Sequence, residues 1–217
     1  MSRPAAARLL VAFDCAMRAA GRRWYVFGAL AAVAYGRPRM TADVDITVEL
    51  RGAGARRLLT ELAPYGFTLR IPLSKEHLAE TQLLPMVHAP TELPLDLVIA
   101  GPGLDDEFLA RANLVDIGGL KVPMISVEDL IAVKVLAGRR KDLEDVRGVL
   151  VEQHGRIDLA RIHDVLAALE DAIGERTLLR RLSRLRRAAD AEASAPQPLP
   201  RAPQPRTPPR SKRRPPR

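Results

Sequence analysis

The sequence predicts an α+β (α/β) fold, in which a mixed β-sheet is flanked by helices and followed by a C-terminal helical part. Strand-like and helical segments alternate up to about residue 125, and the apolar spacing beyond that point is helical. The 217 residues are 47% apolar but only 4% aromatic, so Leu, Val, Ile and Ala must fill the core. We therefore expect an α/β core over 1–125, a helical part over 126–190 that packs on it, and a separate segment over 191–217.

Each expected strand and helix has a local signal in the sequence. Short apolar runs predict strands at 23–28, 43–50, 67–73, 83–89 and 93–101, and a hairpin at 113–126. Helical spacing, glycine stops and a Ser126–Asp129 capping box predict the remaining elements. These are helices at 5–20, 29–36, 54–66, 105–112, 127–138, 140–155, 158–174 and 176–191.

The positive charge belongs to the C-terminal end of the chain. Residues 176–217 hold 13 Lys and Arg against two acids, whereas residues 1–175 hold 21 basic and 24 acidic residues. The stretch 191–217 is mostly Pro, Arg and small residues, which predicts disorder. A basic helix and tail of this kind indicate a nucleic-acid partner such as RNA, or alternatively an end that only aids solubility.

The lengths of the apolar runs and the number of cysteines bear on where the protein is located. No run of about 18 apolar residues could span a bilayer, so we expect a cytoplasmic protein with no membrane partner. The one cysteine, Cys15, excludes an intrachain disulfide and is expected to pack as a small apolar residue.

Two aspartates stand on one face of the strand at 43–50. Asp43 and Asp45 alternate with apolar residues, and Asp96 interrupts another apolar strand, where an unpaired acid would be costly. Mg²⁺ prefers carboxylate oxygens, so a cation held by all three would remove the repulsion. The alternative is a pair of solvent-facing acids on an edge strand.

The surroundings of these acids resemble a known superfamily. The run "FGALAAVAYGRPRMTADVDITV" and the later run "VPMISVEDLIAVKVLAGRRKDLEDV" are similar to motifs of the nucleotidyltransferase superfamily, and more closely of AbiEii-like toxins and minimal nucleotidyltransferases. The resemblance covers about residues 24–150. It implies a nucleotidyltransferase-like fold, Mg²⁺ as cofactor and an NTP as substrate.

The resemblance also implies a role for each matching residue. Asp43, Asp45 and Asp96 would bind the metal, with Asp96 completing a second metal site or acting as base. The catalytic set would be completed by Lys134, as a point charge for phosphate oxygens, and by Asp145, which would orient Lys134 or the base. The nucleotide would be bound by Gly28, Ala29, Arg39, Thr41 and Lys134.

The roles of Ala29 and of the two helix carboxylates, Asp142 and Asp145, remain open to alternatives. Ala29 stands where the family usually has glycine or serine, although its backbone N–H at a helix start can still bind an anion. Asp142 and Asp145 could instead form ordinary ion pairs with Arg139, Arg140, Lys141 or Arg147.

The resulting functional hypothesis is transfer of an NMP from an NTP to an acceptor hydroxyl. Resemblance to the toxins implies RNA, such as a tRNA end, or a protein as acceptor, and a cognate antitoxin as partner. The alternatives are a small-molecule (aminoglycoside-type) nucleotidyltransferase and a catalytically silent binding module of the same fold.

Overall fold

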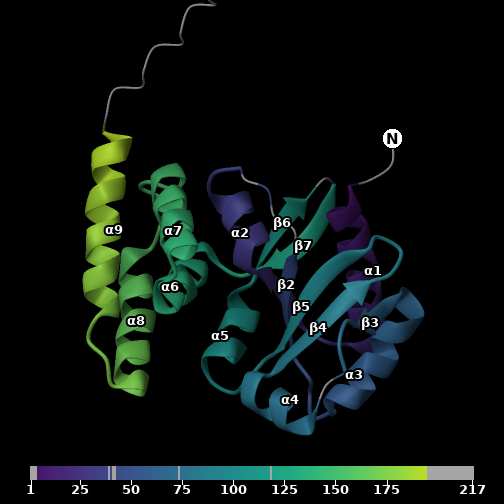
Figure 1. Cartoon of the computed structure of the whole chain (residues 1–217). Helices are drawn as coiled ribbons and strands as arrows, with labels where there is room; N and C mark the ends of the chain where they lie inside the picture. The colour runs from purple at the N-terminus through teal and green to yellow at the C-terminus, as the bar shows by residue number, and fades with distance from the viewer. Residues whose placement is uncertain (1–3, 39, 41–42, 73, 118, 195–217) are drawn as a thin grey trace, which may run out of the picture.

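A computed structural model describes residues 4–38, 40, 43–72, 74–117 and 119–194. The chain forms a curved mixed sheet flanked by helices, beside which the C-terminal helices stand as a separate layer (Figure 1). The predicted fold class is confirmed.

Among the described residues, seven strands form one sheet in the order β3-β4-β5-β2-β1-β7-β6. Their bounds are β1 Trp24–Phe27, β2 Val44–Val48, β3 Phe67–Leu69, β4 Leu83–His88, β5 Leu93–Ile99, β6 Asn113–Ile117 and β7 Leu120–Met124. The pairs β2–β5 and β1–β7 are parallel, and the other neighbours are antiparallel. The predicted 113–126 hairpin is the β6–β7 pair.

The helices also follow the predicted spacing, except for Lys75–Thr81, where no helix was predicted. In the core they are α1 Ala5–Ala20, α2 Gly28–Tyr35, α3 Ala55–Leu62 with a 3₁₀ turn at Ala63–Tyr65, α4 Lys75–Thr81 and α5 Leu104–Arg111. In the C-terminal part they are α6 Val127–Ala137, α7 Arg140–Glu152, α8 Leu159–Ile173 and α9 Leu178–Ala193. The N–H of Asp129 donates to the Ser126 hydroxyl at 3.1 Å, so the expected cap begins α6.

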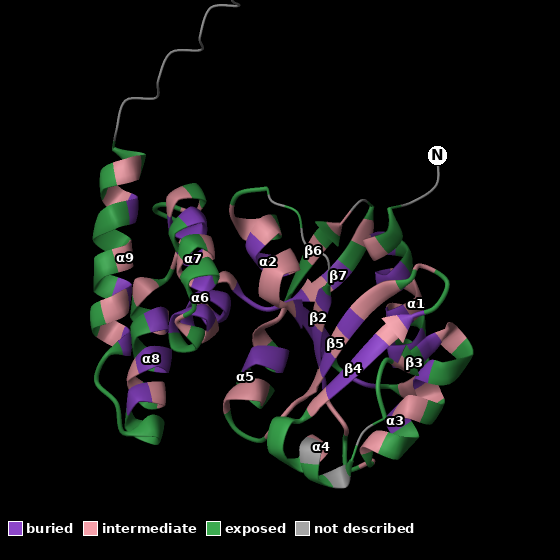
Figure 2. Cartoon of the chain, in the orientation of Figure 1, coloured by how far each residue is buried: buried purple, intermediate pink, exposed green. Residues whose placement is uncertain are grey.

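Apolar residues bury one face of the sheet beneath α1 and α3. Ile46, Leu95 and Leu97 are fully buried and pack with Phe13 and Leu58 from these helices. Figure 2 shows this buried layer continuing along the strands. Because side chains alternate along a strand, the residues between these apolar ones point to the opposite face, where α2 contacts β1 and β2.

A buried ion-pair cluster joins the core to the helical part. Asp129 on α6 has no exposed surface and pairs with Arg111 of α5 at 3.1 Å and with Arg161 of α8 at 3.5 Å. Three helices from both parts of the chain therefore share one carboxylate.

The structure differs from two expectations, one for Cys15 and one for the end of the last helix. Cys15 is exposed, so the prediction that it packs as a buried residue was wrong. α9 continues to Ala193, past the residue at which we expected the third segment to begin, and 195–217 lie outside the described residues. Within the described part, no helix combines the length and apolar character needed to cross a bilayer.

Candidate active site

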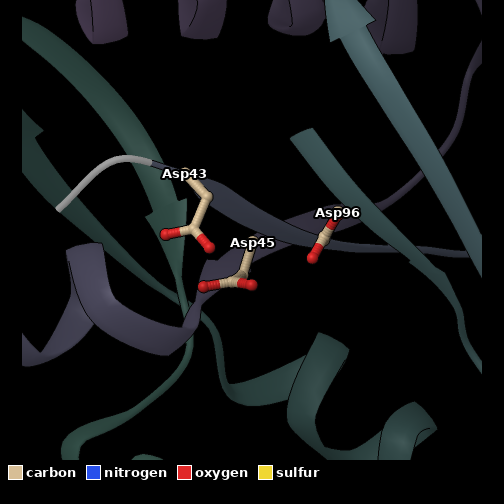
Figure 3. Close-up of side chains that lie close together, drawn as sticks. All are labelled: Asp43, Asp45 and Asp96. Carbon is tan, nitrogen blue, oxygen red and sulfur yellow. The ribbon is translucent and has the colours of Figure 1, made fainter. Parts of the chain in front are cut away.

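Sheet register brings the three predicted aspartates together. Asp45 on β2 lies opposite Asp96 on the parallel strand β5, and Asp43 lies two residues earlier on the same face as Asp45. One carboxylate oxygen from each residue lies within 4.8 Å of the other two. In Figure 3 the three side chains point into one region of the sheet face. The predicted triad is therefore a real cluster in space.

The charges of this cluster oppose one another. Burial raises the pKa of Asp45, the Ala29 N–H lowers it, and the charges of Asp43 and Asp96 raise it further. The net effect is a pKa above the ordinary value. Three half-shielded carboxylates with converging oxygens are the hard, anionic ligands that Mg²⁺ prefers, so the residues fit the predicted cation.

Gly28 lets the start of α2 approach Asp45. Its φ of +65° is left-handed, and a Cβ built there would lie 1.9 Å from the Asp45 Oδ2 atom. The next residue, Ala29, donates its backbone N–H to the same oxygen at 3.3 Å. Glycine is thus required by close contact, and the hydrogen bond fixes the orientation of the Asp45 carboxylate.

Lys134 lies in a buried network behind the triad. Its Nζ atom is 2.8 Å from Asp145 and 3.1 Å from Asp142, and its side chain is only 7% exposed. Asp142 also accepts from Arg139 at 2.5 Å. Burial alone would raise the pKa of Asp142, but the hydrogen bonds from Arg139 and Lys134 outweigh it and lower that pKa.

This network combines the two interpretations of the helix carboxylates. Asp145 holds Lys134, as expected from the resemblance, and Asp142 forms an ion pair with Arg139, as in the alternative interpretation. Lys134 lowers the pKa of Asp45 by its charge, and Asp45 raises that of Arg139 in turn. The two cations are therefore coupled electrostatically to the triad.

Two arginines also lie at the site, of which only Arg139 was anticipated, as an ion-pair partner of the helix carboxylates. The guanidinium of Arg70, just after β3, pairs with Asp96, and Arg139 stands at the start of α7 with a side chain that is 65% exposed. Arg139 lies inside the motif "RRKD", where an ion pair with Asp142 was one of the two interpretations. For Arg70 no local signal exists, since its proximity to Asp96 depends on the order of three strands.

The remaining predicted residues are only partly placed. Arg39 and Thr41 lie outside the described residues. A cavity of about 350 Å³ separates α2 from α7, and Arg37, Lys141 and Asp145 contribute to its wall. Asp145 therefore borders both this cavity and the buried ammonium of Lys134.

Sequence comparison points to one family. Residues 89–184 match the model of a family described as "Nucleotidyl transferase of unknown function (DUF2204)". The matched segment contains Asp96, Lys134 and Asp145, and begins after Asp43 and Asp45. No curated protein matches the chain.

Two solved structures of ANT(2'')-Ia share the fold of this chain, and a third structure is less similar. The solution structure of the antibiotic-resistance factor ANT(2'')-Ia is similar with a TM-score of 0.54 and 16% identity, covering 78% of this chain and 94% of that one. The crystal structure of ANT(2'')-Ia in complex with adenylyl-2''-tobramycin gives 0.51 and 19%, covering 76% and 97%. Protein TM1012 of Thermotoga maritima gives 0.47 and 19%, covering 68% and 93%.

The family match, the shared fold and the clustered acids agree with one another. Residues 89–184 match a nucleotidyl transferase family, the chain shares its fold with ANT(2'')-Ia, and Asp43, Asp45 and Asp96 form a candidate catalytic triad.

Proposed function

We propose that this protein transfers a nucleoside monophosphate from an NTP to an acceptor hydroxyl. The observation that supports this most strongly is the convergence of three carboxylates, within 4.8 Å, from two neighbouring strands beside the start of a helix. Such a cluster fits a divalent cation, and enzymes that transfer phosphoryl groups from NTPs hold their metal ions with carboxylates of this kind.

In the proposed reaction the acceptor oxygen attacks the α-phosphorus of the NTP. A new phosphorus–oxygen bond forms, the bond from the α-phosphorus to the bridging oxygen of the β-phosphate breaks, and pyrophosphate leaves with that electron pair. Asp96 accepts the proton of the attacking hydroxyl. Atoms and charges balance without a further reactant.

The residues of the chain divide into a donor side and an acceptor side. Asp43 and Asp45 would hold Mg²⁺, which neutralises charge on the NTP phosphates when bound. The backbone of Gly28 and Ala29 at the start of α2 and the ammonium of Lys134 add positive potential on the donor side. Asp145 positions Lys134, and Arg39 and Thr41 remain predicted nucleotide-binding residues.

For the acceptor, we propose an RNA end such as that of a tRNA, in an AbiEii-like toxin neutralised by a cognate antitoxin. The motif order in the sequence and the exposed arginines of α9, such as Arg180, Arg184 and Arg187, support this proposal. A small-molecule acceptor is the second candidate, because ANT(2'')-Ia, whose fold is similar, was solved with adenylyl-2''-tobramycin.

Label transfer tests the proposed reaction. The protein is incubated with Mg²⁺, each α-labelled NTP and either total tRNA or tobramycin. We expect labelled tRNA, and at least a 100-fold loss for Asp45→Asn and Asp96→Asn. Asp171→Asn, which removes an exposed ion pair between α8 and Arg176, is the matched control and should keep full activity.

Each alternative predicts a different result. Label on tobramycin alone would support the small-molecule candidate. Binding of tRNA that survives both triad variants, with no label transferred under any condition, would support a silent module and contradict the enzymatic proposal. If the toxin proposal holds, expression should arrest growth, and Asp45→Asn should relieve the arrest.

A further inference from the structure

The cross-strand row of residues that contains Asp45 and Asp96 continues across β4 to Arg70. Asp45 lies opposite Asp96, Asp96 lies opposite Pro85 on β4, and the N–H of Arg70 donates to the Pro85 carbonyl at 2.9 Å. Residues opposite one another on neighbouring strands share a face. Arg70 therefore belongs to the same row as the two carboxylates, on the far side of Asp96 from α2.

Arg70 reaches across Pro85 to contact Asp96. A proline ring has no polar group to bind either partner and is short enough to be crossed by an arginine side chain. The guanidinium forms an ion pair with the Asp96 Oδ1 atom, while the Arg70 side chain stays 39% exposed. Asp96 thus has a counter-ion that can leave toward solvent, unlike the buried Lys134.

The two ends of the row differ chemically. One end has the start of α2 and the network of Lys134, which we assigned to the NTP; the other has Asp96 and Arg70. An acceptor at Asp96 must lie beside the positive charge of Arg70. A guanidinium attracts phosphate oxygens and repels the ammonium groups of an aminoglycoside.

We propose that Arg70 is the acceptor-side specificity residue of this site. It neutralises Asp96 when no cation is bound, and a bound cation displaces it to hold a phosphate group of the acceptor. The acceptor is therefore a phosphate-bearing hydroxyl compound, either an RNA or a mononucleotide. This inference rests on the proposed function for the transfer itself but makes a separate prediction for the empty protein.

The first test needs no activity. Arg70→Gln removes a cation that competes for Asp96, so Mn²⁺ should bind about two- to fivefold more tightly in the absence of NTP. Arg23→Gln is the matched control, because Arg23 also forms a cross-strand pair, with Glu49 at 2.7 Å, and its side chain is 47% exposed. Unchanged or weaker Mn²⁺ binding to Arg70→Gln would overturn the proposal.

The second test compares acceptors. The probes are a 12-nucleotide single-stranded RNA, AMP and tobramycin, each with labelled NTP. For the phosphate-bearing probe that accepts label, Arg70→Gln should raise KM about tenfold with little change in kcat, and Arg70→Lys should restore most of the loss. The RNA and AMP arms distinguish the two sources of phosphate.

Two other results would contradict either the assignment of Arg70 or the proposed reaction. Transfer to tobramycin alone, with a KM that Arg70→Gln does not change, would overturn the assignment of Arg70 and leave the proposed reaction intact. If neither these probes nor total tRNA accepts label, the proposed function is contradicted, and tighter Mn²⁺ binding by Arg70→Gln would still support Arg70 as the counter-ion of Asp96.

Discussion

Replacing Asp45 by asparagine is expected to stabilise the metal-free protein while abolishing its chemistry. The raised pKa of Asp45 means that its charged form is disfavoured in the folded state. Asparagine has the same shape and can still accept the hydrogen bond from Ala29, so the substitution removes charge and leaves the contacts.

The magnitude follows from the geometry of the triad. Two charges 4.8 Å apart repel by about 3.5 kcal/mol at an effective dielectric constant near 20, and by about 0.9 kcal/mol in bulk water. The site lies between these limits, and both Lys134 and the ion pair of Arg70 with Asp96 offset part of the repulsion. We expect Asp45→Asn to raise the free energy of unfolding by about 1–2 kcal/mol, or Tm by roughly 2–8 °C for a chain of this size.

The pH dependence has a definite sign. Because the folded pKa of Asp45 is raised above its ordinary value of 3.8, the wild type loses stability as the pH rises through the folded pKa. The advantage of Asp45→Asn should therefore be present at pH 7 and shrink toward pH 4. Asp142 has a lowered pKa, so its charge stabilises the fold at pH values above its ordinary pKa of 3.8. This stabilisation is lost as the pH falls through the lowered pKa of the folded state.

Thermal melts at several pH values, with and without Mg²⁺, check both signs. Mg²⁺ should raise the Tm of the wild type and leave that of Asp45→Asn unchanged. Asp142→Asn is the contrasting variant and should lower stability by about 2–4 kcal/mol, because it strips a partner from a buried lysine. A lower Tm for Asp45→Asn at pH 7 without Mg²⁺ would refute the argument that the triad is electrostatically strained.

Three further substitutions test the site and its support. Gly28→Ala should lower Mn²⁺ affinity and label transfer at least tenfold, because the new Cβ displaces Asp45; Gly52→Ala, with a similar φ of +76° and no atom within 4 Å, should leave both unchanged. Lys134→Met should cost about 3 kcal/mol in urea unfolding, since it leaves two carboxylates without their shared cation, and a cost below about 0.5 kcal/mol would contradict the buried network. Asp129→Asn should cost about 3 kcal/mol by the same assay, and a neutral effect would show that its two arginines do not depend on it.

The elements and the triad could be predicted because their signals are local. Alternation along a strand puts Asp43 and Asp45 on one face, and Asp96 stands out as an acid inside an apolar strand. The capping hydroxyl of Ser126 and the lysine of α6 are likewise marked by short motifs. These features depend on spacing within a single element.

Features that depend on several elements could not be predicted. The pairing of Arg70 with Asp96 requires β4 to lie between β3 and β5, which no residue near Arg70 indicates. The close approach of Gly28 to Asp45 also depends on how two elements pack, although the glycine itself was predicted to bind the nucleotide. Cys15 was misplaced because α1 has apolar residues on much of its circumference, so the helical period did not define its buried face.

The position of a bound cation tests the proposed mechanism most directly. Crystals of the protein grown with Mn²⁺ and a non-hydrolysable NTP should give an anomalous peak about 2.1 Å from carboxylate oxygens of the triad, with Arg70 moved away from Asp96. A peak that none of the three aspartates contacts, or clear NTP density with no cation among them, would contradict the mechanism.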